Sequence, residues 1–160
     1  MQTTFQPLVQ EKMIKTDETN LAIIKHLRNG RRSYREIADE MGITENTVRS
    51  RVLNLVESGA FEITGLVDPE ALPGHSTAII GIKLNTMNLV KKGEEFSKIK
   101  GVVSVGVVTG RFDLMLTVVL KEEYNLLEFF TKEVSKIKDV QSAETFVVYK
   151  GYNFKVPYIL

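Results

Sequence analysis

Cysteine is absent from the sequence, and histidine occurs only twice in its 160 residues. Without cysteine the chain can form no disulfide bond, no thiolate metal site and no cysteine nucleophile. No apolar run approaches the ~20 residues that a membrane-spanning helix requires, and the N-terminal residues lack the apolar core of a signal peptide. These absences predict a cytoplasmic protein that does not act at a membrane.

An excess of charge of either sign is also missing. Lys and Arg total 21 and Asp and Glu total 20, which gives a formal net charge of +1. The overall charge therefore neither supports nor opposes nucleic-acid binding, and the local distribution of cations has to decide. Hydrophobic residues make up 43% of the chain, which is enough for packed cores and argues against wholesale disorder.

The residue patterns of known enzyme sites are not recognisable either. His26 lies in an expected helix and His75 in an expected linker, and neither has a second histidine at metal-binding spacing. No nucleophile, base and orienting group can be assembled from neighbouring motif positions, and no glycine-rich segment has the spacing of a phosphate-binding loop. The sequence therefore predicts a protein that is not an enzyme, with no catalytic residue, no metal site and no cofactor.

The pattern of apolar residues changes near residue 75. Before this point they recur at helical spacing, and after it β-rich runs alternate with helical ones. The stretch between the two parts contains Pro69, Pro73 and Gly74, a composition typical of a linker. We expect an N-terminal extension (1–15), a helical domain (16–66), a linker (67–75), a mixed α+β domain (76–150) and a C-terminal tail (151–160).

Three helices are expected in the helical domain, at about 17–29, from Ser33 onward, and at about 45–58. Ser33 and Glu36 fit a capping box, in which each side chain binds an otherwise unpaired amide at the helix start. Gly42 allows a tight turn, and Thr44 can cap the third helix. Two helices joined by a glycine-containing turn are typical of a helix-turn-helix. The segment 60–68 is expected to form a short hairpin or wing.

A helix-turn-helix places its second helix in the major groove of DNA, with the N-terminal residues at the bases. Asn and Arg can each make two hydrogen bonds to a base, and cations and amides at a helix start can bind phosphate. Glu45 opposes phosphate binding but can accept from a cytosine amine. The alternative is a plain three-helix bundle whose charges only solubilise it. The candidate DNA contacts are Arg31, Arg32, Ser33, Tyr34, Thr44, Asn46, Thr47, Arg49, Ser50 and Arg51.

The mixed domain shows a βαββαβ pattern with strand 76–85, helix 88–99, strands 102–109 and 111–120, helix 123–137 and strand 140–149. This order is typical of a ferredoxin-like α+β fold, with both helices on one face of an antiparallel sheet. Only Gly110 and its neighbours separate the middle strands, which predicts a tight hairpin. The second helix is expected to bury Leu126, Phe130, Val134 and Ile137. The strands are apolar on both faces, so the uncovered face predicts a partner, most simply a second copy.

The tip of the central hairpin is a second candidate site. Gly110 frees the backbone for a positive φ or for close approach of a ligand. Asp113 lies just inside the following strand, among apolar residues, where it can receive a ligand ammonium group. The alternative is an ordinary turn in which Asp113 forms a salt bridge with Arg111. The residue pattern alone favours this alternative.

Two stretches together resemble the Lrp/AsnC family of bacterial and archaeal regulators. They are RRSYREIADEMGITENTVRSRVLNLVESGAF at 31–61 and VVTGRFDLML at 107–116. The resemblance covers about 17–150. Asn20 and Thr19 depart from the family's usual aspartate and apolar residue, and the wing segment lacks the common tyrosine. The family's typical residues fall on Ala38, Gly42, Thr44, Thr47, Val48, Arg51, Leu55 and Gly59, and its Gly-x-x-Asp motif falls on Gly110 and Asp113.

The resemblance implies a sequence-specific transcriptional regulator that binds double-stranded DNA. It implies dimers formed through the sheet, further assembly into larger rings such as octamers, and small effectors, often amino acids, bound near the Gly-x-x-Asp hairpin. The mixed domain would then serve effector binding and oligomerisation, and a two-fold dimer predicts pseudo-palindromic sites. The expected effector residues are Gly106, Gly110, Arg111, Asp113 and Thr145.

Two other functions remain open from the sequence. An architectural DNA-binding protein that ignores effectors would show the same motifs. Sirohaem decarboxylases resemble the same two-part architecture, but their tetrapyrrole substrate would require histidines or cations that converge on its propionates. The two scattered histidines do not favour this enzyme.

Overall fold

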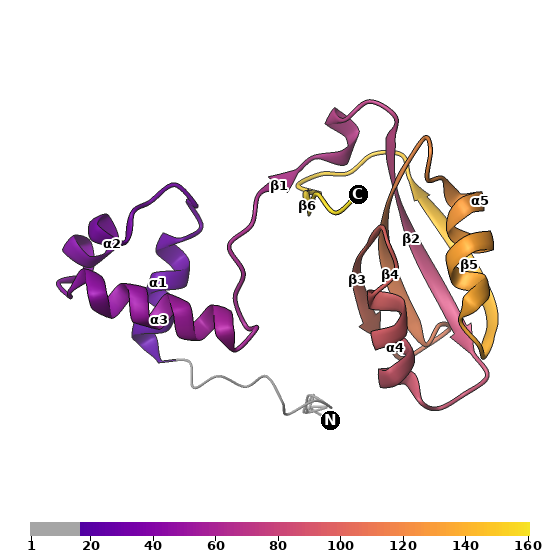
Figure 1. The fold of residues 1–160 in the computed structure, drawn as a ribbon, viewed down its shortest axis with the longest axis horizontal. Coiled ribbons are helices and arrows are strands. Elements are labelled where there is room, and N and C mark those ends of the chain that lie inside the picture. Colours follow the sequence, from indigo (N-terminus) through magenta and orange to yellow (C-terminus); the bar gives the residue numbers. More distant parts are fainter. Residues whose placement is uncertain (1–16) are drawn as a thin grey trace, which may run out of the picture. The chain divides into compact units, whose positions relative to one another are not determined.

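The computed structural model of the protein describes residues 17–160, and the expected N-terminal extension lies outside the described residues. The chain divides into two compact units, one that ends at Thr64 and one that begins at Gly65 (Figure 1). We call them the helical unit and the sheet unit. No helix in the described part of the chain combines the length and the apolar character that crossing a membrane requires.

The helical unit contains the three expected helices, α1 (Glu18–His26), α2 (Tyr34–Met41) and α3 (Glu45–Glu57). A side chain closes each helix start: Asp17 accepts from the amide of Asn20, Ser33 and Glu36 form the capping box, and Thr44 accepts from the amide of Thr47. These bonds satisfy amides that have no partner inside the helix. Gly42 joins α2 to α3 with a φ of 65°, a left-handed conformation that favours glycine. The helix-turn-helix is confirmed.

The core of the helical unit lies between the three helices. Its fully or almost fully buried side chains are Ile23, Ile37, Ala38, Val48 and Val52. Leu27, Tyr34, Met41 and Ile43 pack around them. Because Val48 and Val52 are one turn apart, they occupy one face of α3 and leave its opposite face to solvent.

The expected hairpin or wing at 60–68 is wrong. Leu66–Val67 forms a short strand, β1, but its antiparallel partner is β6 (Val156–Pro157) in the C-terminal tail. A short 3-10 helix, η1 (Pro69–Ala71), follows β1 inside the expected linker. The tail therefore supplies the hydrogen-bonding edge for this segment, and both strands belong to the sheet unit.

The sheet unit has the expected βαββαβ order and an antiparallel sheet. The sheet order is β3-β4-β2-β5, with the two helical segments on one face (Figure 1). The ferredoxin-like α+β fold is confirmed. The elements of this unit are β2 (His75–Leu84), α4 (Leu89–Ser97), β3 (Val102–Val107), β4 (Leu114–Lys121), a helical segment from α5 (Leu126–Glu128) to Lys136, and β5 (Val140–Val148).

The connection between β3 and β4 is longer than the sequence predicts. Six residues, 108–113, separate the strands, so the tight hairpin at Gly110 is wrong. The amide of Val108 donates to the carbonyl of Asp113, and the amide of Asp113 donates to the carbonyl of Ile82 in β2. Asp113 is thereby drawn towards β2, and β4 begins only at Leu114.

The second helical segment is not one regular helix. After α5 the chain widens into a π-helical turn, η2 (Phe129–Glu133), and then tightens into a 3-10 turn, η3 (Val134–Lys136). The amide of Val134 donates to the carbonyl of Phe129, five residues earlier. This wide turn rotates the side chains, so that Phe129 is fully buried while Phe130 is only partly buried. Phe130 still packs against the core, as expected, but its burial is only partial, and the fully buried Phe129 was not predicted.

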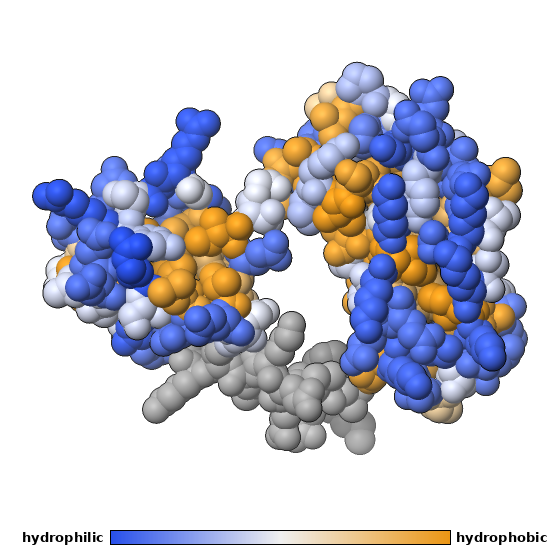
Figure 2. Space-filling model, in the orientation of Figure 1, coloured by the Kyte–Doolittle hydropathy of each residue, from blue (hydrophilic) through white to orange (hydrophobic). Residues whose placement is uncertain are grey.

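The main core of the sheet unit lies between the sheet and its helices. Alternate residues of β2 and β4 point towards the helices and are almost fully buried. Phe96 of α4 and Phe129 cover them. Rows of hydrophilic side chains extend over the visible surface of this unit, with apolar side chains between them (Figure 2). The buried strand residues are Ala78, Ile80, Ile82, Leu84, Leu114, Leu116, Val118 and Leu120.

The other face of the sheet, which we call the open face, also carries apolar side chains. The strand register places Ile79 of β2 between Thr117 of β4 and Phe146 of β5 on this face. Phe146 is 43% exposed. A large apolar side chain that stays exposed on a sheet face marks a surface suited to contact with another protein.

Candidate functional site

The exposed face of α3 brings together three of the predicted DNA contacts. Asn46, Arg49 and Ser50 are exposed and lie at positions i, i+3 and i+4, while Val48 and Val52 are buried on the opposite side. The spacing places the three polar side chains on one surface of the helix. A helix held by its apolar side that presents polar side chains outward has the arrangement needed to read the major groove.

Arg49 is held by two neighbours. Its Nη2 atom lies 2.7 Å from Oε1 of Glu45, one turn earlier in α3. Its guanidinium carbon lies 5.4 Å from the centre of the Tyr34 ring, at the start of α2. The Glu–Arg spacing of four residues could have predicted the ion pair. The contact with Tyr34 joins two helices and has no signal in the sequence.

Arg32 is engaged within the helical unit. It donates to a carboxylate oxygen of Glu40, and its Nη1 donates to Nδ1 of His26 at 2.7 Å. The bond from Arg32 holds the pKa of Glu40 below its usual value. Arg32 therefore links the end of α1 to α2, and its side chain is only 22% exposed. The contacts of Arg32 with His26 and Glu40 were not predicted from the sequence.

Arg51 also joins helices. Its Nη1 lies 2.6 Å from Oδ2 of Asp17 and donates to Oδ1 of Asn20 at 3.0 Å. The bond from Arg51 is the largest cause of a lowered pKa at Asp17. By contrast, Arg31 and Arg35 are exposed and form no ion pair with a described residue. The candidate DNA contacts thus include two arginines that connect helices, Arg32 and Arg51, as well as the exposed Arg31.

Asp113 is bound to β2 rather than to Arg111. Its Oδ1 lies 2.9 Å from Nζ of Lys83, and its Oδ2 accepts from the amide of Leu84 at 2.8 Å. The Leu84 amide, and after it the ammonium of Lys83, hold the pKa of Asp113 below its usual value. The alternative of a salt bridge with Arg111 is wrong. Both carboxylate oxygens serve to fix the 108–113 loop to β2.

Arg111 forms an ion pair with a residue of β5. Its Nη2 lies 2.6 Å from Oε2 of Glu144, and its guanidinium carbon lies 5.4 Å from the centre of the Phe112 ring. Phe112 in turn lies on Gly81, where a Cβ would come within 2.6 Å of the ring. Gly110 has a φ of 125°, which explains the glycine in this loop.

The remaining predicted effector residues lie on opposite faces of the sheet. The register aligns Gly106, Met115, Gly81 and Glu144 in one row on the open face. Thr145 pairs with Ile80 and faces the helices. The structure therefore does not bring the Thr145 side chain to the loop, because strand residues alternate between faces. The neighbouring Glu144 faces the loop instead, and it was not among the residues predicted from the sequence.

A pocket of about 430 Å³ lies beside the loop. It brings two cations, Lys83 and Arg111, and one carboxylate, Glu144, to one opening, with Phe112 as an apolar wall. Such a site offers partners both to a ligand carboxylate and to a ligand ammonium group. Ser142 and Ala143 complete the lining.

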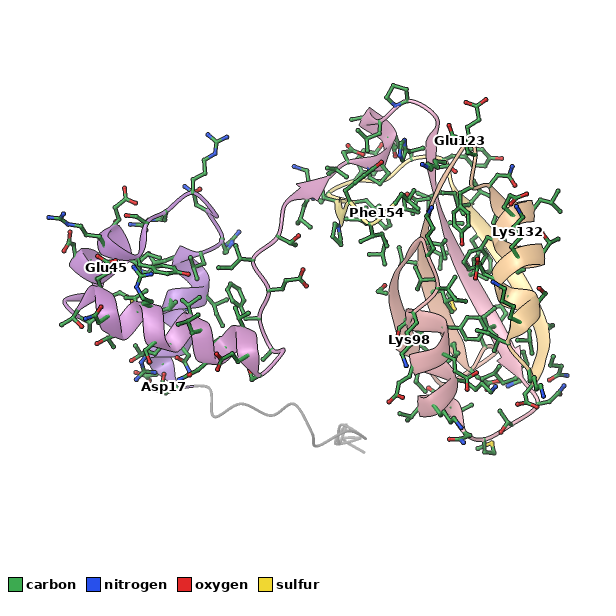
Figure 3. The ribbon with its side chains drawn as sticks, viewed as in Figure 1. Asp17, Glu45, Lys98, Glu123, Lys132 and Phe154 are labelled. Carbon is green, nitrogen blue, oxygen red and sulfur yellow. The ribbon has the colours of Figure 1, made fainter. Side chains whose placement is uncertain are left out.

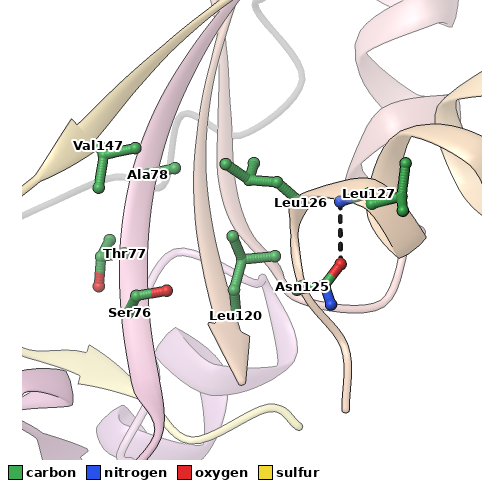
Figure 4. Close-up of a pocket in the computed structure, with 8 residues that line it drawn as sticks. All are labelled: Ser76, Thr77, Ala78, Leu120, Asn125, Leu126, Leu127 and Val147. Atoms are coloured by element: carbon green, nitrogen blue, oxygen red, sulfur yellow. Dashed lines mark hydrogen bonds between the residues drawn. The ribbon is translucent and has the colours of Figure 1, made fainter. Parts of the chain in front are cut away.

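A second pocket, of about 280 Å³, lies on the helix side of the sheet (Figure 4). Its walls are mainly aliphatic, and Asn125 beside it caps α5 by accepting from the amide of Leu127 at 3.0 Å. No charged side chain lines it. The described residues also contain no group of three or more metal-ligating side chains.

Comparisons with known proteins match each of the two units to a domain family. Residues 17–56 match the model of the AsnC-type helix-turn-helix domain, and residues 77–155 match that of the Lrp/AsnC ligand binding domain. An HTH-type transcriptional regulator of Pyrococcus horikoshii is 30% identical over 139 residues, which cover 86% of this chain and 88% of the relative. The regulator Ptr1 of Methanocaldococcus jannaschii is 29% identical over 140 residues, which cover 85% and 93%.

Solved structures show the same fold. A Neisseria meningitidis transcriptional regulator, determined as a complex with L-Met, superposes with a TM-score of 0.65 at 21% identity. The match covers 85% of this chain and 91% of that protein. Since both domain models match in order and the relatives are covered almost completely, the chain belongs to the Lrp/AsnC family.

Proposed function

We propose that the protein is a sequence-specific DNA-binding transcriptional regulator that responds to a small effector. The observation that supports DNA binding is the exposed row of Asn46, Arg49 and Ser50 on an α3 helix that is capped and buried on its other side. The relatives are named transcriptional regulators. Its partner would be double-stranded DNA, and the protein would act in the cytoplasm.

The DNA contacts divide into base and phosphate contacts. Asn46, Arg49 and Ser50 on α3 would face base edges, together with Thr47. The exposed Arg31 and the amides at the start of α2 would bind phosphates. Arg32 and Arg51 have carboxylate partners within the unit, so their main role would be to hold the helices at the angle that docking requires.

The open face of the sheet would contact a second copy of the chain. Phe146 is exposed there beside Ile79, and an exposed apolar sheet face is suited to contact with a second protein. A two-fold dimer presents two α3 helices, so its DNA sites would be pseudo-palindromes with half-sites one helical turn, about 34–36 Å, or a multiple apart. Larger rings, such as octamers, would form from these dimers.

The effector would be an amino acid or a similar zwitterion in the pocket beside the 108–113 loop. Lys83 and Arg111 can bind its carboxylate, and Glu144 can bind its ammonium group. Asp113 would keep Lys83 in position. The structural relative bound to L-Met supports an amino acid as the class of ligand.

The test of the effector is a thermal-shift screen with each of the twenty amino acids. A ligand that binds only the folded state raises the melting temperature, by an amount that grows with its concentration. Glu144→Gln should abolish the shift, while Lys132→Ala, an exposed residue outside the pocket, should preserve it. If no amino acid shifts the wild-type protein, the alternative of an effector-independent architectural protein is favoured.

The test of DNA binding is selection from a library of random-sequence duplexes. We expect enriched duplexes to contain a two-fold related pair of half-sites. Failure to enrich any sequence at low salt would contradict the proposed function. The decarboxylase alternative gains no support, because His26 is engaged by Arg32 in the helical unit, and His75 belongs to the sheet unit.

A further inference from the structure

The contacts of Arg49 suggest how the α3 surface selects its DNA sequence. Glu45 occupies the first position of α3 (Figure 3) and Arg49 lies one turn later on the same face. The Arg49 side chain is 54% exposed and that of Glu45 is 43% exposed. Tyr34 approaches from α2, with its ring 5.4 Å from the Arg49 guanidinium carbon. Three side chains from two helices therefore meet on the DNA-facing surface.

Tyr34 has a packing role that fixes its ring. It is only partly exposed and packs against the core cluster that includes Ile37 and Val48. A ring held in this way offers its face to the guanidinium, a favourable arrangement for a cation. A long arginine side chain otherwise occupies many rotamers. Restricting these rotamers in the free protein lowers the conformational entropy that is lost when the protein binds DNA.

Glu45 is an unusual residue at the tip of a DNA-reading helix, because its charge repels phosphates. Here the charge is matched by Arg49, at 2.7 Å. An arginine has five N–H donors and a carboxylate has about four lone-pair sites, so one contact between them leaves several free. Arg49 therefore keeps N–H donors for a guanine, and Glu45 keeps acceptor sites for the amino group of a cytosine.

We propose that Tyr34, Glu45 and Arg49 form one base-reading unit that selects a G·C pair in each half-site. Arg49 donates two hydrogen bonds to O6 and N7 of the guanine, and Glu45 accepts from N4 of the paired cytosine. Tyr34 is a positioning residue that holds the guanidinium with its ring and makes no base contact. This inference rests on the proposed DNA binding, to which it adds a preferred base pair.

The experiment compares full-length variants in selection from random-sequence duplexes. The variants are Glu45→Gln, Arg49→Lys, Tyr34→Phe and Tyr34→Leu. The control is Glu57→Gln, which removes one negative charge from the exposed last residue of α3. Each protein is then titrated with the selected duplex and with a copy in which the G·C pair of each half-site is replaced by A·T. The ratio of the two affinities measures the preference independently of protein stability.

The wild-type protein should prefer the G·C duplex by about tenfold or more, as expected for a two-bond arginine contact. Glu45→Gln should reduce that preference and bind both duplexes more tightly, since a repulsive charge is gone. Arg49→Lys should reduce the preference, because a lysine ammonium lacks the planar pair of N–H donors that matches O6 and N7 and also stacks on the Tyr34 ring. Glu57→Gln should preserve it.

Tyr34 separates positioning from direct contact. Tyr34→Phe keeps the ring and should keep the preference, whereas Tyr34→Leu should reduce it at the same base pair. An equal loss in Tyr34→Phe and Tyr34→Leu would mean that the hydroxyl contacts DNA, which overturns the positioning role. If the enriched sequence is the same for wild type, Glu45→Gln and Tyr34→Leu, the base-reading unit is wrong although DNA binding stands. If the wild type enriches no sequence, both the unit and the proposed function fail.

Discussion

Each of the two units is stabilised internally by hydrogen bonds, but the bonded residues are close in sequence in one unit and far apart in the other. In the helical unit, Asp17, Ser33 and Thr44 each bind an amide three residues ahead and so define where a helix begins. In the sheet unit, the loop at 108–113 is fixed by Asp113 to Lys83 and Leu84, which are 30 and 29 positions away. Short-range signals can be recognised in a window of sequence, whereas partners that the fold brings together cannot.

The same difference separates the two candidate sites. The α3 surface is formed by consecutive turns of one helix, so its polar face follows from residue spacing. The pocket beside the loop combines Lys83 of β2, Arg111 of the loop and Glu144 of β5. Its composition depends on which strands are neighbours. The predictions below test this contrast between local and long-range determinants.

The largest effect is expected in the core of the sheet unit. Phe129→Ala should lower the free energy of unfolding of this unit by about 3–5 kcal/mol, because it leaves a large cavity. The matched control is Phe130→Ala, which removes a partly buried ring and should cost less. Urea unfolding followed by circular dichroism measures both. A larger loss for Phe130→Ala would indicate a regular helix in place of the π turn.

A smaller effect is expected where the loop is bound to β2. Asp113→Asn should lower stability by about 1.5–3 kcal/mol, the range for hydrogen bonds to a charged group. Glu144→Gln, which breaks the more exposed pair with Arg111, should cost at most about 1 kcal/mol. Thermal unfolding compares the two variants. Equal losses would mean that the long-range bond of Asp113 contributes no more than a surface pair.

Asp113 also gives the sheet unit a pH dependence of known sign. Because its pKa is lower in the folded state than in the unfolded chain, the unfolded state binds the proton more readily. The stability that it contributes is complete above its unfolded pKa of about 3.9 and is lost as the pH falls through the folded value. Asp113→Asn should flatten the fall in melting temperature below about pH 5. An unchanged acid profile would contradict this assignment.

The local determinants of the helical unit are expected to be individually weaker. Ser33→Ala removes the N-cap of α2 and should cost about 1 kcal/mol. Ser50→Ala, at an exposed position inside α3, removes the same hydroxyl without removing a cap and should change stability by less than about 0.5 kcal/mol. Chemical unfolding of both variants makes the comparison. If Ser50→Ala cost as much as Ser33→Ala, the capping box would not define this helix start.

The smallest stability effect is expected at Arg31, which forms no ion pair with a described residue. Arg31→Ala should change stability by less than about 0.5 kcal/mol and lower the salt dependence of DNA binding by about one unit of slope. Arg32→Ala should instead lower the melting temperature, because Glu40 and His26 lose their shared partner. Titration of a fixed duplex at several salt concentrations distinguishes the two. Identical slopes for wild type and Arg31→Ala would exclude a phosphate contact.

Much of the fold could be predicted from the sequence where the signal was periodic or local. The capping box at Ser33, the turn at Gly42 and the βαββαβ order are all confirmed. The wing at 60–68 could not be excluded in advance, because Leu66 and Val67 do form a strand and only their partner in the tail was missed. The π turn at Phe129 has no local signal, because it depends on how the segment packs on the sheet.

The sequence by itself determined the helix starts of the helical unit, the polar face of α3, the order of elements and the glycine of the loop. These features depend on backbone preferences and on periodicity, which act over a few residues. The tertiary structure alone decided that Asp113 binds Lys83, that Glu144 and not Thr145 faces the loop, and that the Tyr34 ring contacts Arg49. Each of these contacts joins separate elements, and the strand register and helix packing that create them are properties of the whole fold.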